Sequence, residues 1–301
     1  MLLLVSLISS GCATTTNSMQ QHSPTARNVA KMEAKEDKEG SLEKLTYEEL
    51  IYRGNRHLAQ GDPKLASLHF QMALRRHADS AEAYAGLGES LALNGDNQSA
   101  HAFLDKALLI DNRNRQALLS TGKLYREERN YEQAEISFTR AIQIYPDDPE
   151  TLTELAITYG RIDKEELAAP LLTKVVKLKP QDASAYNNLG FNYLLRKNYP
   201  EAIESFRQAL KIEPDSHRIM NNLAAAYALD SQPQKAFNLF RKTGNEATAY
   251  NDLGYIYMIM GKDATARSSF DKAIQLNPRY YIRAKENLTL LETEQDQELD
   301  Q

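Results

Sequence analysis

The sequence predicts an all-α protein, a right-handed α-solenoid of about seven helix-turn-helix repeats followed by a C-terminal capping helix. Two observations support this fold class. Alanine recurs every 34 residues from Ala66 to Ala236 and once more, 30 residues on, at Ala266. A large apolar residue follows each of these alanines by four positions, and a glycine or alanine precedes each by twelve. Such a fixed period is typical of stacked structural repeats.

The unit from Ala183 to Ser216 shows why each repeat is expected to form two helices. Its apolar residues recur three and four positions apart, first around Leu189 and again around Phe206, which is the pattern of two amphipathic helices. A turn is expected near residues 196–198. Small residues at Gly190 and Ala202 allow the two helices to approach closely, and Pro214 cannot continue the second helix.

A helix-turn-helix unit of 34 residues with this pattern resembles the tetratricopeptide repeat. The sixth repeat is four residues short, with Gly244 ending its second helix, and the first has Arg53 where an apolar residue is usual. An amphipathic capping helix and an acidic tail are expected after the last repeat. The expected solenoid spans 47–296, with repeats at 47–80, 81–114, 115–148, 149–182, 183–216, 217–246 and 247–280, a cap at 281–296 and a tail at 297–301.

The N-terminal segment predicts a lipid anchor. Residues 1–11 carry no charged side chain and include the apolar run 2–8, as in a short signal peptide. Ser10-Gly11-Cys12 then resembles the lipobox of bacterial lipoproteins, which implies cleavage before Cys12 and lipidation of its sulfur. Ser9, where leucine is usual, and the lack of Lys or Arg before the run depart from that pattern. The alternative is a free thiol at Cys12.

Residues 12–46 are expected to form a lipidated, mostly disordered tether, because they contain few large apolar side chains. The lipoprotein resemblance implies a place in the cell envelope. For a host with two membranes, the same resemblance implies the periplasmic face of the outer membrane, because Ala13 rather than aspartate follows the cysteine.

Composition and motifs exclude several classes of function. The 36 Lys and Arg against 41 Asp and Glu leave a net charge of −5, which argues against a nucleic-acid partner. The single cysteine excludes a disulfide framework and a cysteine-based zinc site. The six histidines are scattered, and no phosphate-binding glycine loop is present. The sequence therefore predicts no enzyme, no cofactor, no metal and no small-molecule substrate.

The remaining candidate for function is a groove for a protein or peptide. The repeat resemblance implies that the first helix of each unit lines a concave face. In the late repeats its groove positions carry asparagines in one row beside apolar side chains, which suits an extended peptide or an amphipathic helix. The alternative is that these residues pack against adjacent repeats. The candidate groove residues are Asn187, Phe191, Leu194, Asn221, Ala225, Asn251, Tyr255 and Met258.

The leading functional expectation is a lipid-anchored scaffold that supports assembly of an envelope complex such as a pilus or secretion secretin. The combination of a lipobox-like end with tandem repeats, including Asn222-Leu223-Ala224 and Asp252-Leu253-Gly254, resembles tight-adherence and type IV pilus assembly lipoproteins. One alternative is a periplasmic adaptor for cell-wall enzymes or proteases. A second is a cytoplasmic interaction protein with a misannotated start.

Overall fold

A computed structural model describes residues 44–277, 282, 284–289 and 291 of the chain. The predicted signal peptide, Cys12 and nearly all of the predicted tether lie outside the described residues, as does the acidic tail. The division of the chain into these segments therefore stays a prediction. Every regular element among the described residues is a helix, so the all-α prediction is confirmed.

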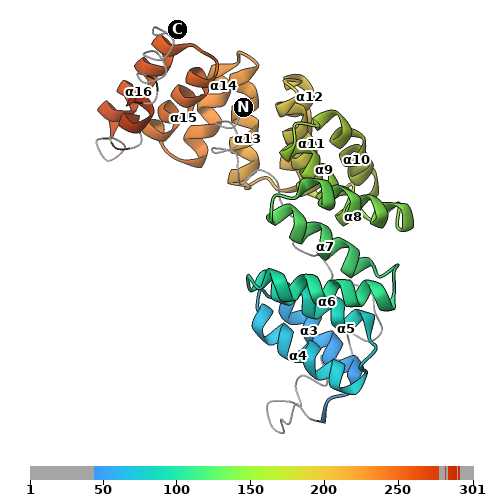
Figure 1. Cartoon of the computed structure of the whole chain (residues 1–301). Helices are drawn as coiled ribbons and strands as arrows, with labels where there is room; N and C mark the ends of the chain where they lie inside the picture. The colour runs from blue at the N-terminus through green and yellow to red at the C-terminus, as the bar shows by residue number, and fades with distance from the viewer. Residues whose placement is uncertain (1–43, 278–281, 283, 290, 292–301) are drawn as a thin grey trace, which may run out of the picture. The chain divides into compact units, whose positions relative to one another are not determined.

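The helices form antiparallel pairs, called hairpins below, each made of a first and a second helix (Figure 1). The chain divides into two units, one ending at Asp163 and one beginning at Lys164. In the N-terminal unit the helices are α3 (Tyr47–Ala59), α4 (Pro63–Arg76), α5 (Ala81–Leu93), α6 (Asn97–Ile110), α7 (Arg115–Glu127), α8 (Tyr131–Ile144) and α9 (Pro149–Arg161).

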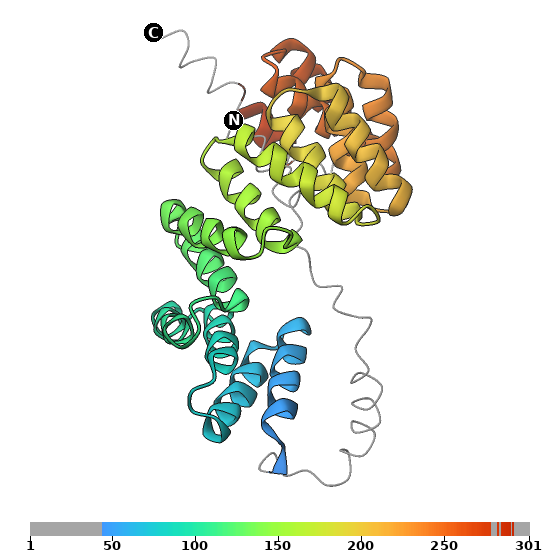
Figure 2. The ribbon, with the colours of Figure 1, turned by 90° about the vertical axis from the view of Figure 1, so that its right-hand side faces the viewer.

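The C-terminal unit continues the same alternation (Figure 2). In the sixth repeat, the second helix, α14, has 11 residues, three fewer than α12, and its C-cap is Gly244. The described residues of the expected capping helix are helical, and Ala284 and Leu291 pack in one cluster with Phe270. The helices of this unit are α10 (Glu165–Leu178), α11 (Ala183–Leu195), α12 (Tyr199–Ile212), α13 (His217–Leu229), α14 (Pro233–Thr243), α15 (Glu246–Ile259) and α16 (Asp263–Leu276).

The recurring glycines and large apolar residues meet where the two helices of a hairpin cross. Phe138 of α8 is fully buried, and a Cβ added to Gly122 of α7 would lie 2.5 Å from its ring. Phe206 has the same relation to Gly190 in the C-terminal unit. The 34-residue pattern therefore records a packing requirement, because a side chain at Gly122 or Gly190 would clash with the aromatic ring of the second helix.

The turns between first and second helices share one backbone feature. Each contains one residue with a left-handed backbone conformation. In three turns this residue is a glycine, Gly61, Gly95 or Gly261, and glycine adopts this conformation at the least cost. Arg129 and Lys197 adopt it in equivalent turns with φ near 60°. The helix starts are defined by side chains: Thr46 and Glu49 form a capping box at α3, and Asp62 caps α4.

The first hairpin has a polar outer side. Arg53 and His57 of α3 occupy the positions that Leu87 and Leu91 fill one repeat later. Leu87 is buried between hairpins, whereas no described hairpin precedes α3. The arginine that departs from the repeat pattern is thus suited to a terminal repeat, which needs a polar outer face.

Candidate functional site

The first helices of successive hairpins contact one another and form one layer in each unit. In the N-terminal unit, α3 contacts α5, α5 contacts α7 and α7 contacts α9; in the C-terminal unit, α11 contacts α13 and α13 contacts α15. The side of this layer that faces away from the second helices is called the first-helix face below. It is the face on which the sequence places the candidate binding residues.

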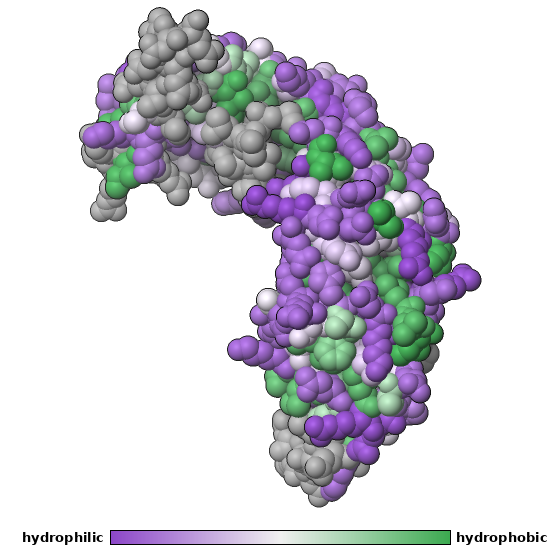
Figure 3. All heavy atoms as spheres, in the orientation of Figure 1, coloured by the Kyte–Doolittle hydropathy of each residue, from purple (hydrophilic) through white to green (hydrophobic). Residues whose placement is uncertain are grey.

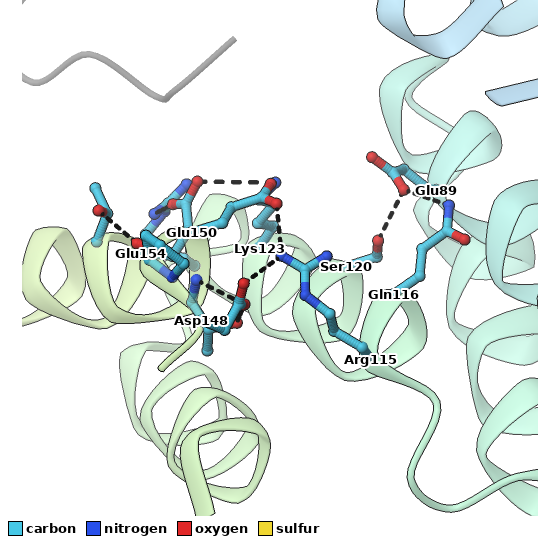
Figure 4. Close-up of polar contacts among 12 residues, drawn as sticks. Glu89, Arg115, Gln116, Ser120, Lys123, Asp148, Glu150 and Glu154 are labelled. Carbon is cyan, nitrogen blue, oxygen red and sulfur yellow. Dashed lines mark hydrogen bonds and ion pairs between the residues drawn. The ribbon is translucent and has the colours of Figure 1, made fainter. Parts of the chain in front are cut away.

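Hydrogen bonds and ion pairs join the first helices α5, α7 and α9 of the N-terminal unit (Figure 4). They form the polar network, whose members are Glu89, Arg115, Gln116, Ser120, Lys123, Arg126, Asp148, Glu150 and Glu154. On α5, one oxygen of the Glu89 carboxylate, Oε2, accepts hydrogen bonds from Gln116 Nε2 at 3.0 Å and from Ser120 Oγ at 3.1 Å. Both donors belong to α7. These bonds therefore join two neighbouring hairpins through neutral donors.

The next pair of first helices is joined by ion pairs. Lys123 Nζ of α7 donates to Glu150 Oε1 of α9 at 2.8 Å and lies 3.8 Å from Glu154 Oε1. The guanidinium of Arg126 also bonds Glu154, which is only 1% exposed. Charges this deeply buried require partners, because burial removes their hydration.

Arg115 completes the polar network at the start of α7. Its Nη2 donates to Asp148 Oδ1 at 2.7 Å and to Glu150 Oε2 at 2.9 Å. Asp148 is also the N-cap of α9 and accepts a hydrogen bond from the Thr151 backbone N–H. The same aspartate thus fixes the start of α9 and ties it to α7.

The polar network repeats with the period of the chain. Glu89 bonds residues 27 and 31 positions later, and Lys123, 34 positions after Glu89, bonds residues at the same two spacings. The candidate groove residues predicted from the sequence all lie in the late repeats, so the prediction did not include Lys123 and Arg126 or their partners Glu150 and Glu154. The available signal was a glutamate 27 residues after Lys123 and another 28 residues after Arg126.

The ion pairs shift the pKa values of the groups that form them. Burial by itself would raise the pKa of the Glu150 carboxyl, but Lys123 and Arg115 overcome this effect and hold the pKa below its usual value. Burial likewise opposes ionisation of Asp148, yet hydrogen bonds from Arg115 and Thr151 lower its pKa. Both groups are therefore carboxylates at neutral pH.

These shifts predict acid sensitivity. A carboxyl whose pKa is lower in the folded state contributes stability above its unfolded pKa, and this stability is lost as the pH falls through the folded pKa. We expect the urea midpoint of the full chain to fall below about pH 4, where unfolded carboxyls titrate. Arg115→Gln should flatten this dependence, because it removes a cause of both shifts. Parallel pH profiles for the variant and the wild type would contradict the assignment.

The asparagines of the predicted groove in the C-terminal unit are engaged within the chain. Asn187 is fully buried, and its Oδ1 accepts a hydrogen bond from Asn222 Nδ2 at 2.8 Å. Asn221 is exposed and accepts from Thr243 Oγ1 at 2.6 Å. Asn251 Oδ1 accepts from Asn287 Nδ2 at 3.3 Å. Asn187 and Asn251 thus bond the following repeat or cap, in line with the packing alternative, and peptide binding by these amides stays a prediction.

The apolar residues of the predicted groove lie in two clusters. Phe191, Leu194 and Ala225 share a buried cluster that spans α11 to α15. Tyr255 and Met258 belong to a separate cluster with Phe270. The structure therefore brings the first three together and places the other two beside the capping helix; their role in binding is a prediction that these contacts do not test.

The described residues provide few other candidates for a site. Among them, no three His, Cys, Asp or Glu side chains are grouped so as to hold a metal ion. None of the helices in the described part is both long and apolar enough to cross a membrane. The surface in view mixes polar and apolar side chains (Figure 3), and mixed surfaces of this kind are ordinary for folded proteins.

Tandem helical hairpins that pack on their neighbours and form a layer of first helices in each unit define a helical-repeat scaffold, a class that binds other proteins. Family models described as tetratricopeptide repeat match residues 53–114, 116–148, 183–216 and 247–280. Together these matches span more than half of the sequence. The chain belongs to the tetratricopeptide-repeat proteins.

Solved structures share this fold. A tetratricopeptide repeat protein from Parabacteroides merdae has a TM-score of 0.57 and 21% identity, covering 81% of this chain and 98% of its own. PilF from Pseudomonas aeruginosa has a TM-score of 0.58 and 20% identity, covering 65% of this chain and 89% of its own. The comparison with curated proteins gave no match. At these identities the likeness concerns the fold.

Proposed function

We propose that this protein is a lipid-anchored scaffold whose first-helix faces bind protein or peptide partners at the cell envelope. The observation that carries the proposal is the change in chemistry along that face. The first helices of the N-terminal unit carry a polar network of charged and amide groups, whereas those of the C-terminal unit carry buried asparagines and apolar clusters at the corresponding positions. A scaffold with two chemically distinct faces can hold two different partners, or two segments of one partner.

The proposed anchor rests on the N-terminal sequence. Cys12 is the only cysteine, and it follows an uncharged apolar run and the small residues Ser10 and Gly11. Two or three acyl chains on this residue would hold the protein stably on a membrane, because each buried CH₂ contributes about 0.8 kcal/mol. The polar residues that follow would separate the repeats from the lipid surface. The proposed location is the periplasmic face of the outer membrane.

The proposed process is assembly of an envelope complex such as a pilus or a secretion channel. Its support is the combination of a lipobox-like N-terminus with tandem tetratricopeptide repeats in one chain. PilF of Pseudomonas aeruginosa shares the fold at 20% identity, which makes it a useful reference for the geometry of the hairpins.

Labelling of the full chain with radioactive palmitate in a bacterial host tests the anchor. We expect incorporation into the wild type and complete loss in Cys12→Ala, because the sulfur is the proposed acceptor. Ser18→Ala replaces another small polar residue of the same segment by alanine. It is the matched control and should label like the wild type. Equal labelling of Cys12→Ala and the wild type, or no labelling of either, would refute the anchor.

A further inference from the structure

We infer that Glu89 and Leu93 of α5 form a docking site for a lysine or arginine side chain of a bound partner. This inference rests on the proposed partner-binding role of the first-helix face and specifies the chemistry of one partner residue. It is carried by the charge balance of the polar network and by the exposure of Leu93.

The polar network leaves one carboxylate without a cationic partner. Arg115 is bonded to Asp148 and Glu150, Lys123 to Glu150, and Arg126 to Glu154. In the part of the chain that the structure describes, Glu89 forms no ion pair and is bonded only by the neutral donors of Gln116 and Ser120. The negative charge of Glu89 is therefore oriented by these donors but not neutralised by direct contact.

The geometry of Glu89 leaves part of its carboxylate available. Both hydrogen bonds use Oε2, so Oε1 retains its acceptor capacity. Figure 4 shows the two oxygens separated in this way, with Oε2 directed to α7. The ammonium of Lys123 experiences the charge of Glu89 but bonds Glu150 instead. A carboxylate held in place before binding loses little freedom when it accepts a donor.

Leu93 supplies the apolar half of the docking site. It lies four residues after Glu89 on α5, and therefore on the same side of the helix, and it is 57% exposed. Lysine and arginine combine an aliphatic stem with a charged head. The stem can pack on Leu93 while the head forms a charge-assisted hydrogen bond with Glu89 Oε1.

The same positions one repeat later do not form such a pair. They are Lys123 and Glu127, and Lys123 is already bonded to Glu150. An anionic group beside an exposed leucine is thus specific to α5 within this pair of repeats. The site would select a basic residue at one defined place in a partner segment.

Selection of random twelve-residue peptides displayed on phage, with the full chain as bait, tests the inference. We expect clones selected by the wild type to carry Lys or Arg at one fixed position. Glu89→Gln keeps an acceptor for Gln116 and Ser120 but removes the charge, so such a clone should bind it about tenfold more weakly. Glu132→Gln on α8 removes an exposed carboxylate and is the matched control; it should bind like the wild type. Glu89→Lys should select Asp or Glu instead.

The outcomes separate this inference from the proposed function. Enriched clones without a fixed basic residue, or clones that bind Glu89→Gln as tightly as the wild type, would overturn the docking site while supporting peptide binding. Failure of every form to enrich any peptide would overturn both. Urea midpoints of the variants, measured in parallel, show that each one is folded.

Discussion

Phe138→Ala is expected to lower the free energy of unfolding of the N-terminal unit by about 3–5 kcal/mol, the cost of removing a buried phenylalanine ring. Phe138 is fully buried and fills the space left by Gly122 at the crossing of α7 and α8. Neighbouring backbone cannot collapse into the cavity without disturbing both helices. Urea denaturation followed by circular dichroism measures the change.

Ile136→Ala is the matched control for this prediction. Ile136 lies on the same helix, two residues before Phe138, and is 53% exposed. Its truncation should change the free energy of unfolding by less than about 1 kcal/mol, because little apolar surface is buried there. Equal shifts for the two variants would contradict the assignment of Phe138 as the residue that packs this hairpin.

The second large effect is expected at Glu154. Glu154→Gln should destabilise the N-terminal unit by about 3 kcal/mol, because it leaves the charge of Arg126 without its partner. The Arg126 side chain is only 13% exposed, so water compensates little of that loss. Adding Arg126→Met should restore part of the stability, since the double variant no longer buries an unpaired charge. The measurement is again the urea midpoint.

Glu166→Gln provides the control for the ion-pair prediction. Glu166 accepts two hydrogen bonds from Arg196, at 2.6 and 3.1 Å, but its side chain is largely exposed. Solvent screening limits such a surface pair to about 0–1 kcal/mol, despite its good geometry. A larger loss at Glu166 than at Glu154 would show that burial of the polar network is not the source of its contribution.

The regular spacing of glycine, alanine and large apolar residues in the sequence predicts most of the fold, because this spacing follows from how the helices pack. Glycine at 122 and phenylalanine at 138 are both required by one helix crossing, so the crossing leaves a periodic trace in the sequence. The shortened α14 and its end at Gly244 are visible in the same way. The polar outer side of the first hairpin at Arg53 departs from the pattern, because among the described residues no hairpin precedes α3 for it to contact.

The candidate site could be predicted only in part. Spacing alone places Glu89, Lys123 and Asn187 on the first helices. It does not show which side chains of the next repeat reach them, because this depends on the angle and distance between successive hairpins. The bond from Asn222 to Asn187 and the bonds from Lys123 and Arg126 to the α9 carboxylates are products of that geometry.

Site-specific photo-crosslinking in the native cell tests the central claim, that partners bind the first-helix face. A benzophenone amino acid is placed at Leu93 on α5 and, as the control, at Leu109 on α6, which is 86% exposed and therefore more accessible. We expect a discrete adduct from position 93 and none from position 109. Adducts from position 109 alone, or equal adducts from both, would contradict the claim that the first-helix face is the binding surface.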